Sequence, residues 1–444
     1  MEPREKKILI VGLGKTGIQT LKFLLKKGAD LRASDVTSIE KLSKDIRQFV
    51  EAGIEIEAGG HKTETFLWAD TIVLSPGVPF GLAPIKEAIS NGIEVISEIE
   101  LAWRFIKKPI VAITGSNGKT TTSTLIARIL EAAGKKVFLG ANIGTPLIQI
   151  AEEDDPYDFL VLELSSFQLQ GIFTFRPHIG VLLNISPNHL DHHESFDEYV
   201  EAKMNMFLNQ TQDDWAIYNS DDEVIRENSS AIKSRRIPFG KTPLEGGVFY
   251  DGKHVKFRDE AYDLRGMKLV GMHNIENVMA AIAATRTLGC ESSLIKEEIV
   301  SFAPLPHRIE FIRKVKEAAI YNDSKSTSPG ATLRAIESFP APIVLIAGGK
   351  DKGVSYGVLR DEIRKRVKLL VLFGESKQRM REELGGDVET VLVQSLDEAV
   401  RKALFNSEGG DTVLFSPACS SFDMFTSYEE RGRVFKEIVQ GLSD

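Results

Sequence analysis

The sequence predicts an α/β protein of three domains, each built around a largely parallel sheet. Short apolar runs alternate with helix-period patterns along most of the chain, which is typical of strand–helix–strand units. Several of these runs end in turns rich in glycine, serine or lysine, as expected at the carboxyl edge of a parallel sheet. The chain has 444 residues, more than a single hydrophobic core normally organises.

Composition and charge narrow the class of protein. Hydrophobic residues make up 42% of the chain and charged residues 27%, as in ordinary folded domains. The formal net charge of −8 argues against a nucleic-acid partner. Cys290 and Cys419, the two cysteines, rule out a disulfide framework and fit a reducing, cytoplasmic location. We find no signal-peptide pattern and no apolar run long enough to span a membrane.

The central domain begins with a loop that follows the apolar run 109–113 and reads TGSNGKTT. Apolar residues at helical spacing come next and end at Gly134, so the loop joins a buried strand to a helix N-terminus. Backbone amides at such a terminus favour phosphate, Lys119 adds a positive charge, and the Thr120 hydroxyl suits Mg²⁺. The motif predicts a nucleoside-triphosphate site, although Ile113 stands where the usual spacing has a glycine. The alternative is an ordinary strand-to-helix turn.

The N-terminal region carries a second glycine-rich turn. The strand pattern 7–11 runs into residues 12–17, which read GLGKTG, and Asp35 follows the next strand. This Rossmann-like pattern leaves three interpretations open: NAD binding, glycines needed only for tight packing, or another nucleotide on the same scaffold. The strand 71–74 ends in Ser-Pro-Gly at the same expected sheet edge, which favours a shared ligand. This domain is expected to end near residue 107.

Two further strands of the central domain end in polar residues. The run 159–162 delivers Glu163 to a strand tip, where a carboxylate suits Mg²⁺ coordination, activation of a nucleophile, or plain solvation. The strand 179–184 is followed by three histidines and an aspartate within residues 189–193, for which zinc is conceivable. We prefer His189 as a residue that assists a magnesium site and expect the other two histidines to be exposed.

Less specific signals complete the central domain. The helix pattern 197–207 contains Lys203, which by residue type alone is expected to be a surface charge. The stretch 235–270 alternates short strand patterns with turns and predicts a small antiparallel appendage. Residues 273–277 (HNIEN) come just before the helix pattern 278–288, where amide side chains either cap the helix or read a base edge.

A third α/β domain is expected after the paired prolines near residue 305. Four of its strand patterns end in small, polar or cationic residues, which predicts one binding edge for an anionic ligand. These four strands are expected at residues 320–322, 343–347, 369–373 and 412–415.

Together the motifs resemble the Mur ligase family nearly from end to end. A phosphate loop without the first Walker glycine is the form that this family carries. The first domain is most similar to that of the member that adds D-glutamate to UDP-N-acetylmuramoyl-L-alanine, in which a Rossmann-like domain holds the uridine nucleotide. The motifs that carry the resemblance are TGSNGKT (114–120), ELSSFQL (163–169), His189–Asp191, Tyr199–Lys203, HNIEN (273–277), PHR (306–308), DSKST (323–327), Gly348–Lys352 and Ser416–Cys419.

The resemblance implies an ADP-forming ligase of cytoplasmic peptidoglycan precursor synthesis, which supports cell shape and division. ATP would phosphorylate the carboxylate of the L-alanyl substrate, and the amine of D-glutamate would attack the acyl phosphate. Lys119 and two Mg²⁺ ions would neutralise the repulsion between ATP and that carboxylate. We expect domains at residues 1–107 (UDP-substrate), 108–305 (ATP) and 306–444 (amino acid), a hinge near 304–308 that closes on ligands, and a monomer.

The resemblance also assigns site residues. Thr120 and Glu163 match the first magnesium position, and His189 and Lys203 match the second. Lys203 is implied to be carbamylated by CO₂, because a carbamate is an anion that ligates Mg²⁺. Catalytic roles fall on Lys119, His189, Lys203 and Asn142. ATP contacts are implied for Gly115, Asn117, Gly118, Lys119, Thr120, Thr121, Asn274, Asn277, Arg308, Asp323 and Lys325. UDP-substrate contacts are implied for Lys15, Thr16, Asp35, Thr37, Ser75, Gly77, Asn142 and Gln168, and amino-acid contacts for Thr327, Lys352, Ser421 and Tyr428.

Two departures from the family pattern bear on amino-acid selection. Phe422 stands where a smaller aliphatic residue is common, and Lys350 adds charge where an acid is expected. The alternatives are a sister Mur ligase or a folylpolyglutamate synthetase-like ligase with another acceptor. Two rivals come from other classes: an NAD dehydrogenase, resting on residues 12–17 and Asp35 alone, and a non-catalytic nucleotide sensor.

Overall fold

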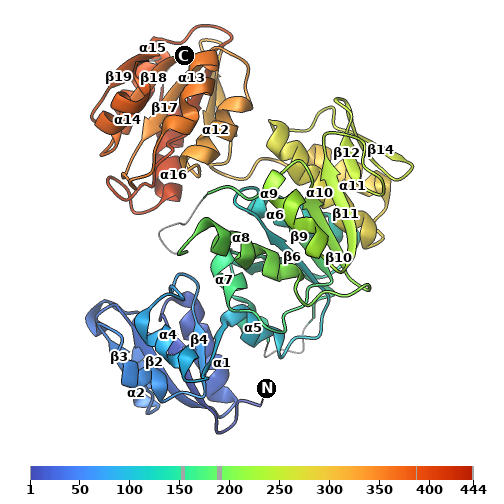
Figure 1. Cartoon of the computed structure of the whole chain (residues 1–444). Coiled ribbons are helices and arrows are strands. Elements are labelled where there is room, and N and C mark those ends of the chain that lie inside the picture. Colours follow the sequence, from blue (N-terminus) through green and yellow to red (C-terminus); the bar gives the residue numbers. More distant parts are fainter. Residues whose placement is uncertain (1, 152–155, 188–192, 387, 443–444) are drawn as a thin grey trace. The chain divides into compact units, whose positions relative to one another are not determined.

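The computed structural model describes residues 2–151, 156–187, 193–386 and 388–442. Its strands form three sheets of five, nine and six strands (Figure 1), as the α/β pattern predicts. The chain packs as two compact units, residues 1–264 with 276–299 and residues 265–275 with 300–444. The first unit contains the first two sheets and the second unit contains the third. Among the described helices, none has the length and apolar character that crossing a bilayer requires.

The N-terminal sheet is parallel throughout, with strand order β3-β2-β1-β4-β5. Its two middle strands, β1 and β4, are buried along nearly their whole length, because helices cover both faces of such a sheet. The strands are β1 (Lys7–Val11), β2 (Asp30–Asp35), β3 (Glu55–Ala58), β4 (Thr71–Leu74) and β5 (Glu94–Ser97). The helices are α1 (Lys15–Lys26), η1 (Ile39–Lys41), α2 (Ile46–Glu51), α3 (Thr63–Leu67), α4 (Ala83–Ser90) and α5 (Glu98–Trp103).

The central sheet has the order β14-β13-β12-β11-β10-β9-β6-β8-β7. The predicted antiparallel appendage is confirmed for β12, β13 and β14, whereas β11 continues the parallel part of the sheet. The strands are β6 (Ile110–Thr114), β7 (Val137–Ala141), β8 (Phe159–Glu163), β9 (Ile179–Leu182), β10 (Trp215–Asn219), β11 (Arg235–Gly240), β12 (Val248–Tyr250), β13 (His254–Phe257) and β14 (Glu260–Asp263). The helices are α6 (Lys119–Ala132), η2 (Leu147–Ile150), α7 (Ser166–Gln170), α8 (Phe196–Met204), η3 (Asn205–Phe207), α9 (Glu223–Asn228), η4 (Ser229–Ala231), α10 (Met272–Thr287) and α11 (Ser292–Ser301).

The start of α10 differs from the prediction. Residues 273–277 were expected before the helix, but α10 already begins at Met272. Gly271 makes the preceding turn with φ +93°, and the side chain of Asn274 donates to the carbonyl of Val270 at 2.7 Å. These two features let the helix begin six residues earlier, so Asn274 and Asn277 lie within its first two turns.

The third sheet has the order β15-β16-β20-β17-β18-β19. The β15–β16 pair is antiparallel and the other pairs are parallel, so the four predicted strands do end at one edge. The strands are β15 (Glu310–Val315), β16 (Ala318–Asn322), β17 (Ile343–Gly348), β18 (Val367–Phe373), β19 (Glu389–Leu392) and β20 (Thr412–Phe415). The helices are α12 (Pro329–Glu337), η5 (Gly357–Leu359), α13 (Arg360–Arg366), α14 (Lys377–Leu384), α15 (Leu396–Phe405) and α16 (Tyr428–Gln440).

Candidate active site

The phosphate loop connects β6 to the N-terminus of α6. Gly115 and Gly118 have φ values of +154° and +87°, which glycine adopts most readily. A Cβ on Gly118 would collide with Oδ1 of Asn277, so the loop packs closely against α10. Nζ of Lys119 donates to the carbonyls of Gly115 at 2.8 Å and Ser116 at 3.1 Å. The lysine charge therefore lies at the loop, and Thr120 and Thr121 follow it in the first turn of α6.

Asn184 and Tyr199, which the sequence analysis did not assign to the site, form hydrogen bonds that stabilise this loop. The Asn184 side chain accepts from the Asn117 amide at 2.8 Å and donates to the Asn117 carbonyl at 3.1 Å. The hydroxyls of Ser116 and Tyr199 are 2.8 Å apart. Asn184 follows β9, the neighbour of β6, and its place at a strand end was the signal available in the sequence.

Lys203 is not the surface charge that its residue type suggests. It is 1% exposed, because α8 turns it toward the end of β6. Its Nζ donates to the carbonyl of Gly115 at 3.1 Å and lies 3.5 Å from Oγ1 of Thr114. Burial, and then the charge of Lys119, hold the pKa of the Lys203 amine well below its ordinary value. A lysine in this environment favours the neutral, nucleophilic amine.

Glu163 ends β8 directly beside the phosphate-loop strand. The parallel register pairs it with Ile113 of β6 and Ala141 of β7. Its side chain is buried, and Oε1 accepts from Nδ2 of Asn142 at 2.8 Å. Oε2 is buried without a hydrogen-bond partner among the described residues. A solvated carboxylate is therefore wrong, and a buried oxygen with an open lone pair fits a cation ligand.

The histidine segment is only partly described. His189, Asp191 and His192 lie outside the described residues. His193 is described, and the expectation that it is exposed is wrong: it is 3% exposed, stacks on Phe167 with ring centroids 5.4 Å apart, and places Nε2 2.9 Å from Oγ of Ser166. In the described part of the chain, no three histidine, cysteine or acidic side chains come together as a metal cluster.

Gln168, implied to contact the substrate, has a structural role at the start of α7. Its Oε1 accepts from the amide of Ser165 at 3.0 Å and closes a capping box there. The Nε2 of the same side chain is buried and has no acceptor among the described residues. The carboxamide nitrogen is thus available for a ligand group.

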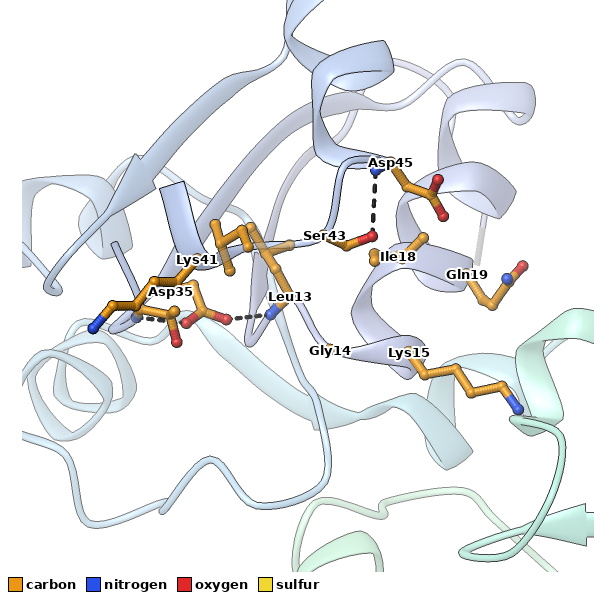
Figure 2. A pocket seen from close by; sticks show the side chains of 11 residues that line it. Leu13, Gly14, Lys15, Ile18, Gln19, Asp35, Lys41, Ser43 and Asp45 are labelled. Carbon is orange, nitrogen blue, oxygen red and sulfur yellow. Dashed lines mark hydrogen bonds between the residues drawn. The ribbon is translucent and has the colours of Figure 1, made fainter. Parts of the chain in front are cut away.

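Asp35 closes the N-terminal glycine turn. Its Oδ2 accepts from the Leu13 amide at 2.6 Å and its Oδ1 from the Thr37 amide at 2.7 Å; Figure 2 shows the first of these bonds, with Lys15 extending away from Asp35. In a dinucleotide site this carboxylate would bind ribose hydroxyls. Here each oxygen accepts from one backbone amide, so Asp35 stabilises the glycine turn.

Two cavities flank this turn. One, of about 500 Å³, lies between Lys15, Asp35, Thr37 and two residues that the sequence analysis missed, Gln19 and Lys41 (Figure 2). The other, of about 290 Å³, is lined by Thr16, Ser75 and Gly77, with His61 as a further missed residue. Both cavities lie where the UDP-substrate residues were predicted, and His61 is too far from any motif to be found from sequence.

The glycines of this turn serve close packing as well. A Cβ on Gly17 would collide with the carbonyl oxygen of Gly12, and Oγ of Ser75 donates to the same carbonyl at 2.6 Å. The strand-end motif around Ser75 therefore contacts the glycine turn directly, as their shared sheet edge predicts.

The third sheet brings together the residues predicted for the amino acid and part of the nucleotide site. Nζ of Lys352 lies 3.4 Å from the carbonyl of Thr327, and Nζ of Lys325 lies 3.8 Å from the ring centroid of Tyr428. Ser421 is buried and follows β20. Arg308 precedes β15. The parallel pairing of β16, β20 and β17 accounts for this grouping.

Asp323 is buried at the same edge. It accepts from Oγ of Ser416 at 2.8 Å and from the Ile309 amide at 3.3 Å. Burial raises the pKa of Asp323 to about 6. The carboxyl therefore anchors the segment that contains Arg308 to the end of β16.

The two departures from the family pattern have structural contexts. Lys350 pairs with Glu375 at 2.6 Å, so a neighbouring acid balances its charge. Phe422 is 72% exposed and contributes an apolar surface next to the buried Ser421.

The fold and the phosphate loop place the chain among multidomain α/β proteins that bind a nucleoside triphosphate. Family models define it further: "Mur ligase MurD-like, N-terminal domain" matches residues 6–97, "Mur ligase middle domain" matches 113–285, and "Mur ligase, glutamate ligase domain" matches 307–419. The chain belongs to the Mur ligase family, whose members are ATP-dependent ligases, and the resemblance is confirmed.

Curated relatives are similar over the full length. A protein from Geotalea uraniireducens (strain Rf4), named UDP-N-acetylmuramoylalanine--D-glutamate ligase, is 44% identical over 449 residues, covering 100% of this chain and 99% of that protein. A protein of the same name from Geobacter sp. (strain M21) is 46% identical over 445 residues, covering 99% and 98%.

Solved structures agree on the fold. A pseudomurein peptide ligase type C from Methanothermus fervidus matches with a TM-score of 0.62 at 21% identity over 99% of this chain and 100% of that one. MurF ligase from Thermotoga maritima in complex with ADP matches with a TM-score of 0.62 at 18% identity over 99% and 96%. At these identities the comparison concerns the architecture alone.

Proposed function

We propose that this protein joins the amine of D-glutamate to the carboxylate of UDP-N-acetylmuramoyl-L-alanine, with conversion of ATP to ADP and phosphate, in cytoplasmic peptidoglycan precursor synthesis. The observation that carries the proposal is the convergence of Lys119 and Lys203 on the Gly115 carbonyl, beside the strand that ends in Glu163. Full-length similarity to relatives that bear the D-glutamate ligase name supports the choice of substrates.

The reaction needs the substrate carboxylate to become an electrophile. A carboxylate oxygen attacks the γ-phosphorus of ATP, the bond to ADP breaks, and an acyl phosphate forms. The amine nitrogen of D-glutamate then attacks the acyl carbon, loses a proton, and phosphate leaves. Lys119 holds the phosphates and offsets the charge that opposes the first step.

We assign two magnesium positions to residues of the central domain. Thr120 and Glu163 would hold the first ion, which matches the open Oε2 of Glu163. Lys203 and His189 would hold the second. Magnesium supplies charge neutralisation of the phosphates and the carboxylate when bound.

Lys203 suits magnesium only after modification. Its lowered pKa favours the neutral amine, whose nitrogen attacks the carbon of CO₂ and loses a proton to give a carbamate. This step replaces a cation, which would repel Mg²⁺, by an anion that ligates it.

Residues of the first and third sheets are proposed to bind the other substrates. The cavities beside Lys15, Asp35 and Ser75 receive the uridine diphosphate, and Asn142 with Gln168 faces the reacting end. Thr327, Lys352, Ser421 and Tyr428 bind D-glutamate, while Asn274, Asn277, Arg308, Asp323 and Lys325 contact ATP. We retain the domain boundaries 1–107, 108–305 and 306–444, and a monomeric enzyme.

The experiment that tests the function measures phosphate release from ATP and Mg²⁺ with UDP-N-acetylmuramoyl-L-alanine and D-glutamate, omitting each in turn. Release that needs both compounds is expected. Phosphate release in the absence of both UDP-N-acetylmuramoyl-L-alanine and D-glutamate would contradict the proposal. So would the absence of phosphate release when both compounds are present. A panel of labelled amino acids separates a sister ligase, and a nicotinamide fluorescence titration tests the dehydrogenase alternative.

A further inference from the structure

Helix α5 carries two buried glutamates whose surroundings differ. Glu100 is fully satisfied: its carboxylate accepts from the amides of Phe173, Thr174 and Phe175 and pairs with Arg104. Glu98 is equally buried, but its Oε1 accepts from the Ile148 amide at 2.6 Å while Oε2 has no hydrogen-bond partner among the described residues.

The Ile148 amide lies at the start of η2, where the backbone donors have no partner within the helix. No side chain caps η2, so the Glu98 carboxyl takes the place of a cap. Burial raises the pKa of this carboxyl to about 7.

The segment that ends at η2 begins at the reacting site. Asn142 donates from its amide to the Glu163 carbonyl at 2.9 Å and from its side chain to Oε1 of Glu163 at 2.8 Å. Halfway along, the carbonyl of Gly144 accepts from Nζ of Lys15 at 2.6 Å. One short loop thus joins the proposed magnesium carboxylate, the proposed uridine site and the Glu98 carboxyl.

The conformation of this loop requires contacts with residues outside it. Ala141 and Gly144 have φ values of +81° and +64°, and a left-handed alanine is a strained conformation that persists only where the surroundings enforce it. Within the loop, the Ala141 amide bonds to the Thr145 carbonyl at 2.9 Å. At the far end, Oε1 of Glu98 accepts from the Ile148 amide and holds the loop there.

We propose that Glu98 is a positioning residue that holds the loop 142–147 in place, so that Asn142 stays on Glu163 and Gly144 stays within reach of Lys15. This inference rests on the proposed function for its kinetic consequences, and on the contacts alone for the placement of the loop. Because Lys15 and Asn142, which this loop contacts or contains, are both assigned to the UDP-substrate, we expect the larger effect of losing Glu98 on that substrate.

The test compares Glu98→Met, which keeps the volume and removes the acceptor, with Glu98→Gln, which keeps one carbonyl oxygen for the Ile148 amide. The full-length protein is studied by hydrogen exchange of the peptides that cover residues 142–150 and 173–175. Glu98→Met is expected to speed exchange in 142–150 about tenfold, the loss of roughly one buried hydrogen bond. Glu100→Gln is the matched control, and it is expected to affect residues 173–175 instead.

Kinetics supply the second readout. For Glu98→Met we expect KM for the UDP-substrate to rise about tenfold with KM for ATP unchanged, and Glu98→Gln to remain within about threefold of wild type. If Glu98→Met does not fold, Glu98→Asp, whose shorter side chain withdraws the carboxylate, replaces it. Unchanged exchange in 142–150 or equal rises in both KM values would overturn the inference.

Different results would contradict the proposed function and the proposed role of Glu98. If the wild-type protein forms no ADP with both substrates, the proposed function is wrong, but the exchange comparison still decides whether Glu98 holds the loop. If the wild-type enzyme is active and the exchange of Glu98→Met equals that of wild type, only the positioning role is wrong.

Discussion

Lys119 and Lys203 donate to one carbonyl oxygen, that of Gly115, at 2.8 and 3.1 Å. Burial, and then repulsion by the charge of Lys119, hold the pKa of the Lys203 amine well below its ordinary value. The neutral amine is therefore more accessible at Lys203 than at an ordinary lysine, whereas Lys119 stands in the phosphate loop itself. The two lysines therefore have different chemistry although they share an acceptor.

Replacement of Lys119 by methionine should lower the rate of ADP formation by roughly 10²–10³-fold, the usual cost of losing a charge that stabilises the transition state. Circular dichroism should stay unchanged. Lys135→Ala, a change at an exposed lysine just beyond α6, serves as the control and should keep the wild-type rate. An active Lys119→Met enzyme would show that the loop does not bind the transferred phosphate.

Lys203→Ala should reduce activity by at least about 100-fold, because the second magnesium ligand is lost. Wild-type enzyme in CO₂-depleted buffer should lose activity and regain it on addition of bicarbonate. Lys203→Arg, which keeps the charge but forms no carbamate, should be inactive and insensitive to bicarbonate. Full activity of Lys203→Ala would eliminate the role.

Asp35→Asn should raise KM for the UDP-substrate roughly 10–100-fold and leave KM for ATP unchanged. The new amide nitrogen faces one of the two backbone donors, Leu13 or Thr37, and a charge-assisted bond of about 1.5–3 kcal/mol is lost from the glycine turn. Steady-state kinetics with each substrate varied separately is the measurement. Equal changes in both KM values would contradict a role confined to the UDP-substrate site.

The free energy of unfolding should decrease as the pH rises between the pKa of Glu98 in the unfolded chain and its pKa in the folded protein. The folded protein keeps the Glu98 proton up to about pH 7, whereas the unfolded chain releases it near the ordinary value of about 4.5. Between these values the unfolded state binds fewer protons, so the free energy of unfolding decreases by an amount on the order of 3 kcal/mol. Thermal unfolding of wild type and Glu98→Gln is compared from pH 4.5 to 8. The unfolding temperature of the wild type should fall relative to that of the variant as the pH rises. Parallel pH profiles would contradict this.

Arg431→Met should destabilise the third-sheet unit by about 3 kcal/mol or more. The guanidinium is fully buried and donates to the carbonyls of Ser324, Cys419 and Ser420, which would lose their partner. Limited proteolysis and calorimetry are the measurements. Arg433→Met, at an exposed position of the same helix α16, is the control and should be neutral.

Local patterns predicted most of the architecture. Alternating strand and helix periods placed parallel strands in each of the three sheets, and β4 and β20 lie at the predicted residues. The edge strands β3 and β19 were not predicted. The errors have local causes: Gly271 starts α10 early, and β11 joins the parallel sheet through pairing with β10 that no periodicity encodes. The candidate active site was predicted mainly from motifs. A phosphate loop is built from consecutive residues, so its pattern is visible in the sequence.

What the sequence by itself determined is which backbone turns exist and which chemistry each turn supports, since glycine, lysine and carboxylate act through short-range geometry. Only the tertiary structure decided which of these groups are buried and what they face. The tertiary structure buries Lys203 and lowers the pKa of its amine, and it packs His193 against Phe167. It also assigns both oxygens of Asp35 to backbone amides, and leaves one oxygen of Glu163 and one of Glu98 without partners among the described residues. Desolvation and pairing depend on contacts between distant segments, which no local pattern contains.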